Sequence, residues 1–337
     1  MNKSCNVAKV SILMAVYNET ESVLRQSIES ILHQTFKDFE FVIIGDNPNN
    51  KALISIVNEY AEKDERIKFH INKENIGLTK SLNVGLRLCT GMKYIARMDA
   101  DDIAFPNRLE KQVDFLEKNQ SVDILNTATI KFRNDDLATG YLMTVPSDSE
   151  KIIGRLLYFN PLFHPTIMIR KSFIDKNKIK YNEAFRRSQD YALWLELASH
   201  GAVFASLQEP LLYYRASANQ ISIKHRDEQK QDAEAIFIYY LKRTIQDLVH
   251  PQNRDSVEKM VSNLAKAVYH DGGVSPYHKE ILYRILLSYD KWSSLVSLIS
   301  KKEIRRIQYS SKRICVLILS CFINRWNTQK IDLYKLL

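Results

Sequence analysis

Cysteine is scarce in this 337-residue chain, and its apolar runs are short. The four cysteines are far apart and form no C-x-x-C pair, which excludes a disulfide framework and a zinc ribbon. No stretch of about 18 uninterrupted apolar residues occurs, so no transmembrane helix is predicted. The polar segment 1–9 lacks the apolar core of a signal peptide. Together these absences predict a cytoplasmic protein with reduced thiols.

The charge of the chain is unbalanced toward basic residues. Its 48 lysines and arginines exceed its 39 aspartates and glutamates, which gives a formal net charge of +9 at pH 7. Such an excess favours an anionic partner: a nucleic acid, a phosphorylated substrate or an acidic membrane surface. Composition alone leaves these three kinds of partner open.

Short apolar runs alternate with helical periods in the first third of the chain. The runs at 9–16 and 39–45 are typical of strands buried on both faces, as in a parallel sheet. Between them an amphipathic helix is predicted, with Asn18 as its start signal. A helix over 51–61, a strand over 67–70, a helix over 78–88 and a strand over 93–98 are expected next. This order predicts an α/β fold with a Rossmann-like, mostly parallel sheet flanked by helices.

The later part of the chain divides into two regions. Strands are predicted over 122–132 and 164–170, and a helix is predicted from its N-cap Ser188 to a stop at Gly201. Beyond about residue 223 glycine and proline become rare and helical periods dominate. We therefore expect an α/β domain over residues 1–222 and a helical C-terminal extension over residues 223–337.

The stretch RMDADD, residues 97–102, begins in the predicted strand 93–98, and its aspartates lie where that strand ends. Its crowded carboxylates repel one another unless a cation lies among them. Ligands of open α/β sheets bind at the carboxyl ends of strands, where a D-x-D turn can hold a divalent cation against a diphosphate. A calcium loop is excluded, because Ala104 stands where glycine is required and Pro106 would break the turn. A solvated turn is the weaker alternative.

Two further carboxylates have both a structural and a functional interpretation. Asp46, after a strand, belongs either to a plain turn or to a nucleobase site; no G-x-G-x-x-G or Walker A loop is present. Asp190 lies in the first turn of a predicted helix, where it stabilises the helix dipole or acts as a general base. Trp194, one turn later, is a core residue or a sugar-stacking platform, and the core is favoured.

Six motifs in order are similar to those of a known family. VSILMAVYNE, FEFVIIGDNPNN and NIGLTKSLNVGLRLCTGMKYIARMDADD are followed by HPTIMIRKS, SQDYALWLEL and LLYYRASANQIS. They resemble the opening strand, the uridine-contacting turn, the N-x-G to D-x-D block and the later blocks of glycosyltransferase family 2. The resemblance runs from Val10 to about Ser222. It implies a GT-A fold and an inverting transfer of sugar from a nucleotide-sugar donor.

The resemblance also implies roles for single residues. Asp46 would hold the uracil, Asp99 the ribose or diphosphate, Asp101 would bind Mn²⁺ or Mg²⁺, and Asp190 would deprotonate the acceptor hydroxyl. A base on one face of the anomeric carbon and a stabilised diphosphate on the other permit a single displacement, which gives a β-linked product. Donor-nucleotide contacts are further implied for Val16, Asn18, Glu19, Asn75, Gly77, Lys80 and Ala100, and donor or acceptor contacts for His164, Gln189, Trp194 and Arg215.

Three positions depart from the family pattern. Gly45 replaces the first of two aspartates in the uridine turn, so Asp46 must act alone. Gln189 stands where glutamate is commonest beside the base. Ser217 stands where many members have histidine, so Arg215 is expected to carry more of the diphosphate charge. His164, which precedes a proline, is either a site contact or a structural histidine.

The C-terminal region joins a basic segment, 301–313, to an apolar run, 314–323, too short to span a bilayer. It suits either an interfacial helix on an anionic membrane or a buried helix with a solvated basic flank. NRW at 324–326 lacks the glutamine of the Q-x-x-R-W motif, so a processive polymer synthase is not predicted.

The motifs together predict transfer of a hexose (glucose, galactose or an N-acetylhexosamine) from a UDP-sugar to a lipid-linked or growing saccharide of the O-antigen or capsule type. The acceptor would be carried on a polyprenyl diphosphate, with the enzyme cytoplasmic or peripheral at the inner face of the plasma membrane. Nucleic acid is not an expected partner. A non-catalytic UDP-sugar-binding protein and a metal-dependent nuclease are the alternatives.

Overall fold

A computed structural model describes residues 9–133, 135–156 and 159–216, and within 228–240 the residues 228–229, 231–233, 235–236 and 239–240. The strands are β1 (Val10–Val16), β2 (Phe39–Gly45), β3 (Ile67–Ile71), β4 (Tyr94–Asp99), β5 (Ile103–Ala104), β6 (Ile124–Arg133), β7 (Asp136–Met143), β8 (Met168–Arg170) and β9 (Phe204–Ala216). The α-helices are α1 (Glu21–Leu32), α2 (Lys51–Lys63), α3 (Leu78–Leu88), α4 (Arg108–Lys118), α5 (Ser149–Leu156), α6 (Lys171–Asn177) and α7 (Gln189–Ser199), with a 3₁₀ turn η1 at His164–Thr166.

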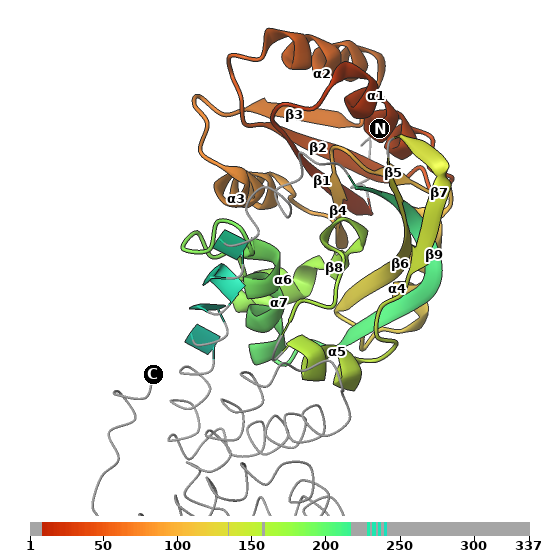
Figure 1. Cartoon of the computed structure of the whole chain (residues 1–337), viewed down its shortest axis with the longest axis vertical. Coiled ribbons are helices and arrows are strands. Elements are labelled where there is room, and N and C mark those ends of the chain that lie inside the picture. Colours follow the sequence, from red (N-terminus) through yellow and green to blue (C-terminus); the bar gives the residue numbers. More distant parts are fainter. Residues whose placement is uncertain are drawn as a thin grey trace, which may run out of the picture. The chain divides into compact units, whose positions relative to one another are not determined.

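The strands form one curled sheet in the order β3-β2-β1-β4-β8-β6-β9-β5, with β7 paired to β6 (Figure 1). The half built from β3, β2, β1 and β4 is parallel, as the alternation of strands and helices predicts. Beyond β4 the sheet is mixed, because β8 runs antiparallel to both β4 and β6 while β9 runs parallel to β6. The α/β class is confirmed, and the sheet is less uniformly parallel than expected.

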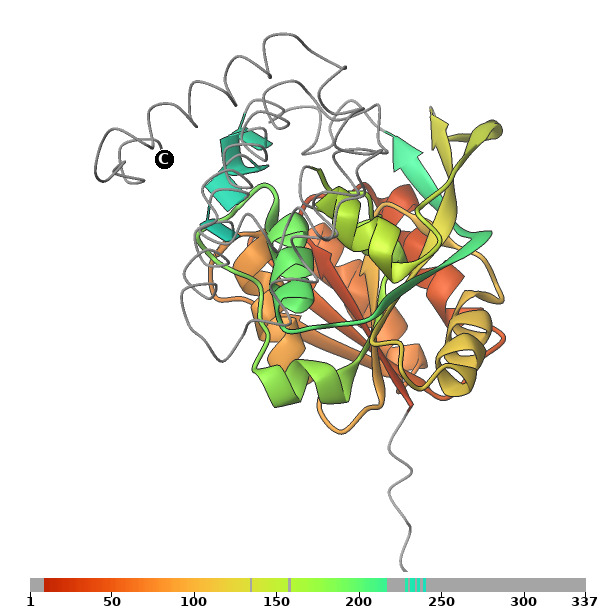
Figure 2. The same ribbon diagram turned by 90° about the horizontal axis from the view of Figure 1, so that it is seen from below.

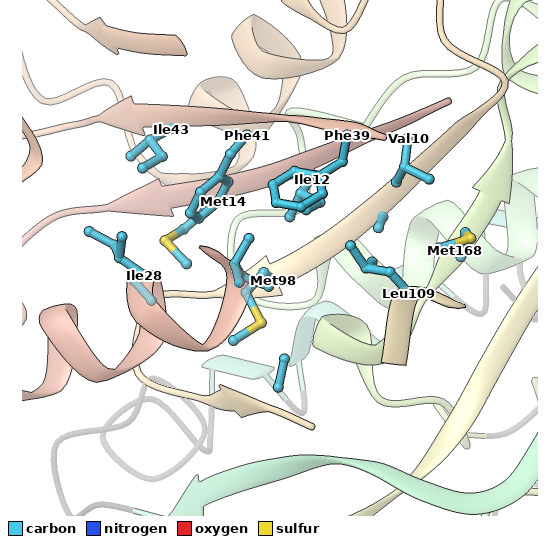
Figure 3. Packing of buried hydrophobic residues seen from close by; sticks show 14 of the residues in the cluster. Val10, Ile12, Met14, Ile28, Phe39, Phe41, Ile43, Met98, Leu109 and Met168 are labelled. Atoms are coloured by element: carbon cyan, nitrogen blue, oxygen red, sulfur yellow. The ribbon is translucent and has the colours of Figure 1, made fainter. Parts of the chain in front are cut away.

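Helices cover both faces of the parallel half (Figure 2). On one face α1, α2 and α4 bury their apolar stripes against alternate residues of β1, β2 and β4. Figure 3 shows this core, in which Met14 of β1 lies beside Ile28 of α1 and Ile12 lies beside Phe39 of β2. Because successive strand residues point to opposite faces, the intervening Leu13 points to the other helical layer, where α3 packs on β1 and β2.

Gly85 lets α3 approach the sheet closely. A Cβ atom at this position would lie 2.1 Å from Cδ1 of Leu13, a side chain that is itself buried. We expect Gly85→Val to lower the free energy of unfolding by about 1–3 kcal/mol, because overpacking forces neighbours to move. Urea denaturation would measure the change. Arg87→Val, on the exposed side of the same helix, is the matched control, and an equal loss there would contradict the packing argument.

Two predicted boundaries were wrong. Helix α1 begins after Thr20 rather than Asn18, because Asn18 is still part of the turn that follows β1. The predicted strand 164–170 is split into η1 and a short β8. Pro165 lies at the start of η1, where its missing N–H costs no helical hydrogen bond. Ser188 is the N-cap of α7 as predicted, although its side chain makes no capping hydrogen bond.

The predicted domain boundary at 222/223 lies within 217–227, outside the described residues. The basic segment 301–313 and the apolar run 314–323 also lie outside the described residues. The chain divides into two compact units, Met1–Ile236 and Phe237–Leu337. Across the described residues, no helix combines the length and apolarity required to traverse a bilayer.

Candidate active site

The carboxyl ends of β1, β2 and β4 lie side by side. The register places Val16 opposite Gly45 of β2, and Ala15 opposite Asp99 of β4. The residues that follow each strand therefore meet at one edge of the sheet, where ligands of open α/β sheets bind. The predicted donor contacts of the β1 turn, the Asp46 turn and the acidic loop are brought together here.

Asp46 organises the turn that leads into α3. Its buried carboxylate accepts hydrogen bonds from Nδ2 of Asn72 (2.8 Å) and from the backbone N–H groups of Ile76 (3.0 Å) and Gly77 (2.9 Å). Gly77 has φ of 85°, which favours glycine. Asp46 thus holds the loop that carries Asn75 and Gly77; its predicted contact with uracil stays a prediction.

The turn after β1 is hydrogen-bonded to the loop after β2 and within itself. The Oδ1 atom of Asn18 accepts a hydrogen bond from Nδ2 of Asn47 (2.8 Å). The carboxylate of Glu19 accepts one from the backbone N–H of Tyr17 (2.8 Å). Burial and the nearby Asp99 raise the pKa of Glu19. Lys80 is exposed in the first turn of α3, beside the Asp46 loop.

The acidic loop is held by buried arginine. Arg97, 4% exposed, pairs its guanidinium with Asp99 and donates to the carbonyl of Leu13 (3.2 Å). Ala100 is buried. Burial, then the charges of Asp99 and Glu19, raises the pKa of Asp101 to about 7. Asp99 and Asp101 therefore have different environments. Asp99 is paired with Arg97, whereas Asp101 is affected by burial and by nearby negative charges.

Arg215 ties the end of β9 to the same loop. Its backbone N–H donates to the buried Asp102 carboxylate (2.8 Å), and its Nε donates to the carbonyl of Asp101 (2.6 Å). The guanidinium also donates to Oε1 of Gln26 (2.8 Å) and pairs with Asp135. Arg215 is buried and fixes the backbone of the loop. The expected contact of this side chain with the diphosphate stays a prediction.

The carboxylates of this edge suit a hard divalent cation. Oxygen ligands are those that Mg²⁺ and Mn²⁺ prefer. The raised pKa of Asp101 reflects burial first and then the charges of Asp99 and Glu19, which a cation would offset. Asp101 and Glu19 are the chain's own candidates to hold it. Within the described part of the chain, no set of three or more His, Cys, Asp or Glu side chains is already gathered in metal-binding geometry.

Asp190 stands in the first turn of α7, half-buried, within electrostatic reach of Asp99. Burial raises its pKa to about 6, although hydrogen bonds from the backbone of Tyr191 and from Asn160 lower it. The Nδ2 atom of Asn160 lies 2.7 Å from Oδ2 of Asp190. A carboxylate that is ionised at neutral pH yet close to neutrality is suited to accept a proton.

Three predicted contacts of this region lie in the interior. Trp194 is fully buried and packs edge-on against His164, so it is a core residue and the sugar-stacking alternative was wrong. His164 lies 2.8 Å from the hydroxyl of Tyr181, and burial lowers its pKa well below the usual value. These contacts favour the structural interpretation of His164. Gln189 is 6% exposed, next to Asp190.

Two residues of the site, Asn160 and Tyr214, were not predicted from the sequence. Asn160 precedes a proline in a loop with no helical or strand period, so only its closeness to the His-Pro motif could have drawn attention to it. Tyr214 of β9 is half-buried, and burial raises the pKa of its hydroxyl. The charges of Asp102, Asp99, Asp101 and Asp190 raise it further.

Residues of the predicted C-terminal extension contact the start of α7. The carboxylate of Asp232 accepts a hydrogen bond from the backbone N–H of Arg187 (2.9 Å), and Glu228 pairs with the Arg187 side chain at 3.0 Å. The hydroxyl of Ser188 donates to the carbonyl of Gln229 (3.3 Å). Glu228, Gln229 and Asp232 therefore support the turn that presents Asp190.

Comparison with known proteins agrees with this geometry. Residues 11–193 match the sequence model described as Glycosyl transferase family 2. The chain is 38% identical to the uncharacterized glycosyltransferase MJ1057 of Methanocaldococcus jannaschii, over 70% of this chain and 78% of that protein. It is 34% identical to the O-antigen biosynthesis glycosyltransferase WbnJ of Escherichia coli, over 61% of this chain and 79% of that protein.

The fold has a counterpart among solved structures. The crystal structure of S. aureus TarS 1-349 in complex with UDP-GlcNAc is similar with a TM-score of 0.55 at 18% identity, over 90% of this chain and 93% of that one. The curled sheet with helices on both faces is thus the GT-A arrangement. A family match that spans more than half of the chain, on this fold and with these carboxylates, shows that the protein is an enzyme of glycosyltransferase family 2.

Proposed function

We propose that this enzyme transfers a hexose (glucose, galactose or an N-acetylhexosamine) from a UDP-sugar, with a divalent cation, to a saccharide acceptor, and inverts the anomeric centre. The observation that carries the proposal is the placement of Asp101 and Asp190. Both lie near Asp99 at one edge of the sheet, with pKa values of about 7 and about 6. An acidic loop and a separate base are what an in-line displacement of a diphosphate requires.

In this mechanism Asp190 accepts the proton of the acceptor hydroxyl as its oxygen attacks the anomeric carbon. The bond from that carbon to the diphosphate oxygen breaks, and UDP leaves with the bonding electrons. The bound cation would stabilise the negative charge of the leaving diphosphate. Arg97 and Arg215 hold the acidic loop in place through Asp99 and through the backbone of Asp101. One base and one displacement give inversion, hence a β-linked product from an α-linked donor.

The acceptor is proposed from the relatives. WbnJ is named for O-antigen biosynthesis, and AmsE of Erwinia amylovora, 31% identical over 63% of this chain, for amylovoran biosynthesis. We infer a lipid-linked or growing surface saccharide as the acceptor class, carried on a polyprenyl diphosphate at the inner face of the plasma membrane. The family membership leaves the nuclease alternative without support.

A thermal-shift panel tests the donor class. The full chain is melted with UDP, GDP, CMP, UDP-glucose, UDP-galactose and UDP-N-acetylglucosamine, each with and without Mn²⁺. Ligand at about 100 times its Kd stabilises the fold by about 2.7 kcal/mol, so we expect Tm to rise by several degrees. The rise should occur for the UDP compounds and require the metal. Equal shifts with GDP would contradict the uridine assignment, and no shift with any nucleotide would contradict the proposal as a whole.

A further inference from the structure

A loop that leads into β8 reaches across to Asp190. Asn160 in this loop donates its side-chain N–H to Oδ2 of Asp190 at 2.7 Å. The other end of the amide, Oδ1, accepts the backbone N–H of Leu162 at 3.1 Å. Only the amide oxygen of Asn160 can accept the backbone N–H of Leu162, so its NH₂ group is the end that faces the Asp190 carboxylate. The orientation of Asn160 is therefore determined by its own loop.

The loop itself is anchored. Pro161 and Leu162 are buried, and the carbonyl of Phe163 accepts hydrogen bonds from Oγ1 of Thr166 (2.9 Å) and Nδ2 of Asn126 (3.3 Å). The ring of Phe163 also packs against that of Tyr214, with centroids 6.2 Å apart. The backbone that carries Asn160 is thus held in place by buried contacts. Such support is needed for a side chain that positions a reacting carboxylate.

We propose that Asn160 is a positioning residue for the transfer reaction, which turns the carboxylate of Asp190 toward the acceptor hydroxyl. The inference rests on the proposed function, in which Asp190 is the base. A second effect accompanies the first: hydrogen bonds to a carboxylate favour its charged form, so Asn160 offsets part of the rise in pKa that burial of Asp190 causes. The titratable groups that face Asp190 include Asp99 of β4, Tyr214 of β9, and Tyr181 in the loop after α6.

Two substitutions separate orientation from loop structure. Asn160→Ala removes the donor, and the isosteric Asn160→Asp replaces it with an acceptor. A hydrogen bond to a charged group changes an equilibrium by about ten- to a hundredfold, so we expect the pKa of Asp190 to rise by about one to two units in Asn160→Ala. In Asn160→Asp two adjacent carboxylates cannot both ionise readily, so the rise should be larger.

The pKa of Asp190 is measured without any substrate, by ¹³C NMR of the carboxyl groups in aspartate-labelled protein, with the Asp190→Asn spectrum as the assignment. Turnover is measured as release of UDP from UDP-glucose, UDP-galactose and UDP-N-acetylglucosamine, with water as the acceptor. Turnover at pH 7 should fall about tenfold in Asn160→Ala and its acid limb should move to higher pH, while the affinity for UDP stays unchanged. Asn119→Ala, which removes an exposed amide donor at the end of α4, is the control and should match the wild type.

The outcomes distinguish the inference from the proposed function. If Asp190→Asn abolishes turnover but both Asn160 variants keep the wild-type pKa and acid limb, the positioning role is wrong and the base assignment stands. If Asp190→Asn keeps full turnover, the base assignment itself is wrong. Loss of UDP affinity and of thermal stability in Asn160→Ala and Asn160→Asp alike would show that the loop is only structural, and would overturn the inference.

Discussion

Asp190→Asn is expected to lower turnover by about 10²- to 10⁴-fold, the usual contribution of a general base. The substitution is isosteric, and the oxygen of the new amide can still accept the hydrogen bond from Asn160, so the fold should be retained. The affinity for UDP should stay near that of the wild type, because Asp190 belongs to a different element from the acidic loop. Steady-state release of UDP, with UDP binding measured by calorimetry, gives both quantities.

The pH profile of the same variant carries a second expectation. The base acts only when ionised, so wild-type activity should fall as the pH drops through about 6, the pKa of Asp190. Asp190→Asn should lose this acid limb along with the rate. Asp114→Asn, an exposed residue of α4 that loses the same charge, should keep both. If turnover and UDP affinity were lost together, Asp190 would have a structural role; unchanged turnover would favour a non-catalytic UDP-sugar-binding protein.

Asp101→Ala is expected to abolish the metal-dependent part of UDP binding. Asp101 is a half-buried carboxylate of the acidic loop, whereas Asp99 in the same loop is already paired with Arg97. The test compares UDP affinity with and without Mn²⁺ in the wild type, in Asp101→Ala and in the surface control Asp114→Ala. An unchanged metal-dependent affinity in Asp101→Ala would remove Asp101 from the proposed metal site.

The raised pKa of Asp101 also leads us to expect that the free energy of unfolding depends on pH. Its pKa in the folded state, about 7, is above the value of about 3.9 expected in the unfolded chain. The folded state then binds the proton more tightly, so the stability that this group contributes is present below pH 4 and is lost as the pH rises through 7. Asp101→Ala should remove this loss, and Mn²⁺ should offset it in the wild type only. Urea denaturation at pH 5 and pH 8 measures the difference.

Much of the fold could be predicted from the sequence, because it depends on periodicity. Apolar runs set the strands β1, β2 and β4, and helical periods set α1 and α3, since each pattern dictates which face is buried. The second half was less predictable. Strand β9 contains Glu209 and Pro210, which interrupt its alternation, and β7 is exposed along most of its length, so neither has a clear apolar pattern.

The sequence by itself determined the family, the α/β class and the position of the acidic loop after a buried strand, because these follow from local pattern and motif order. Tertiary structure alone decided which side chains meet. Asn160 reaches Asp190 across 30 positions, and Arg215 reaches the loop of Asp101 across 114. A period specifies which face of an element is buried but not what packs against it; the partners of a polar side chain are set by the packing of distant segments.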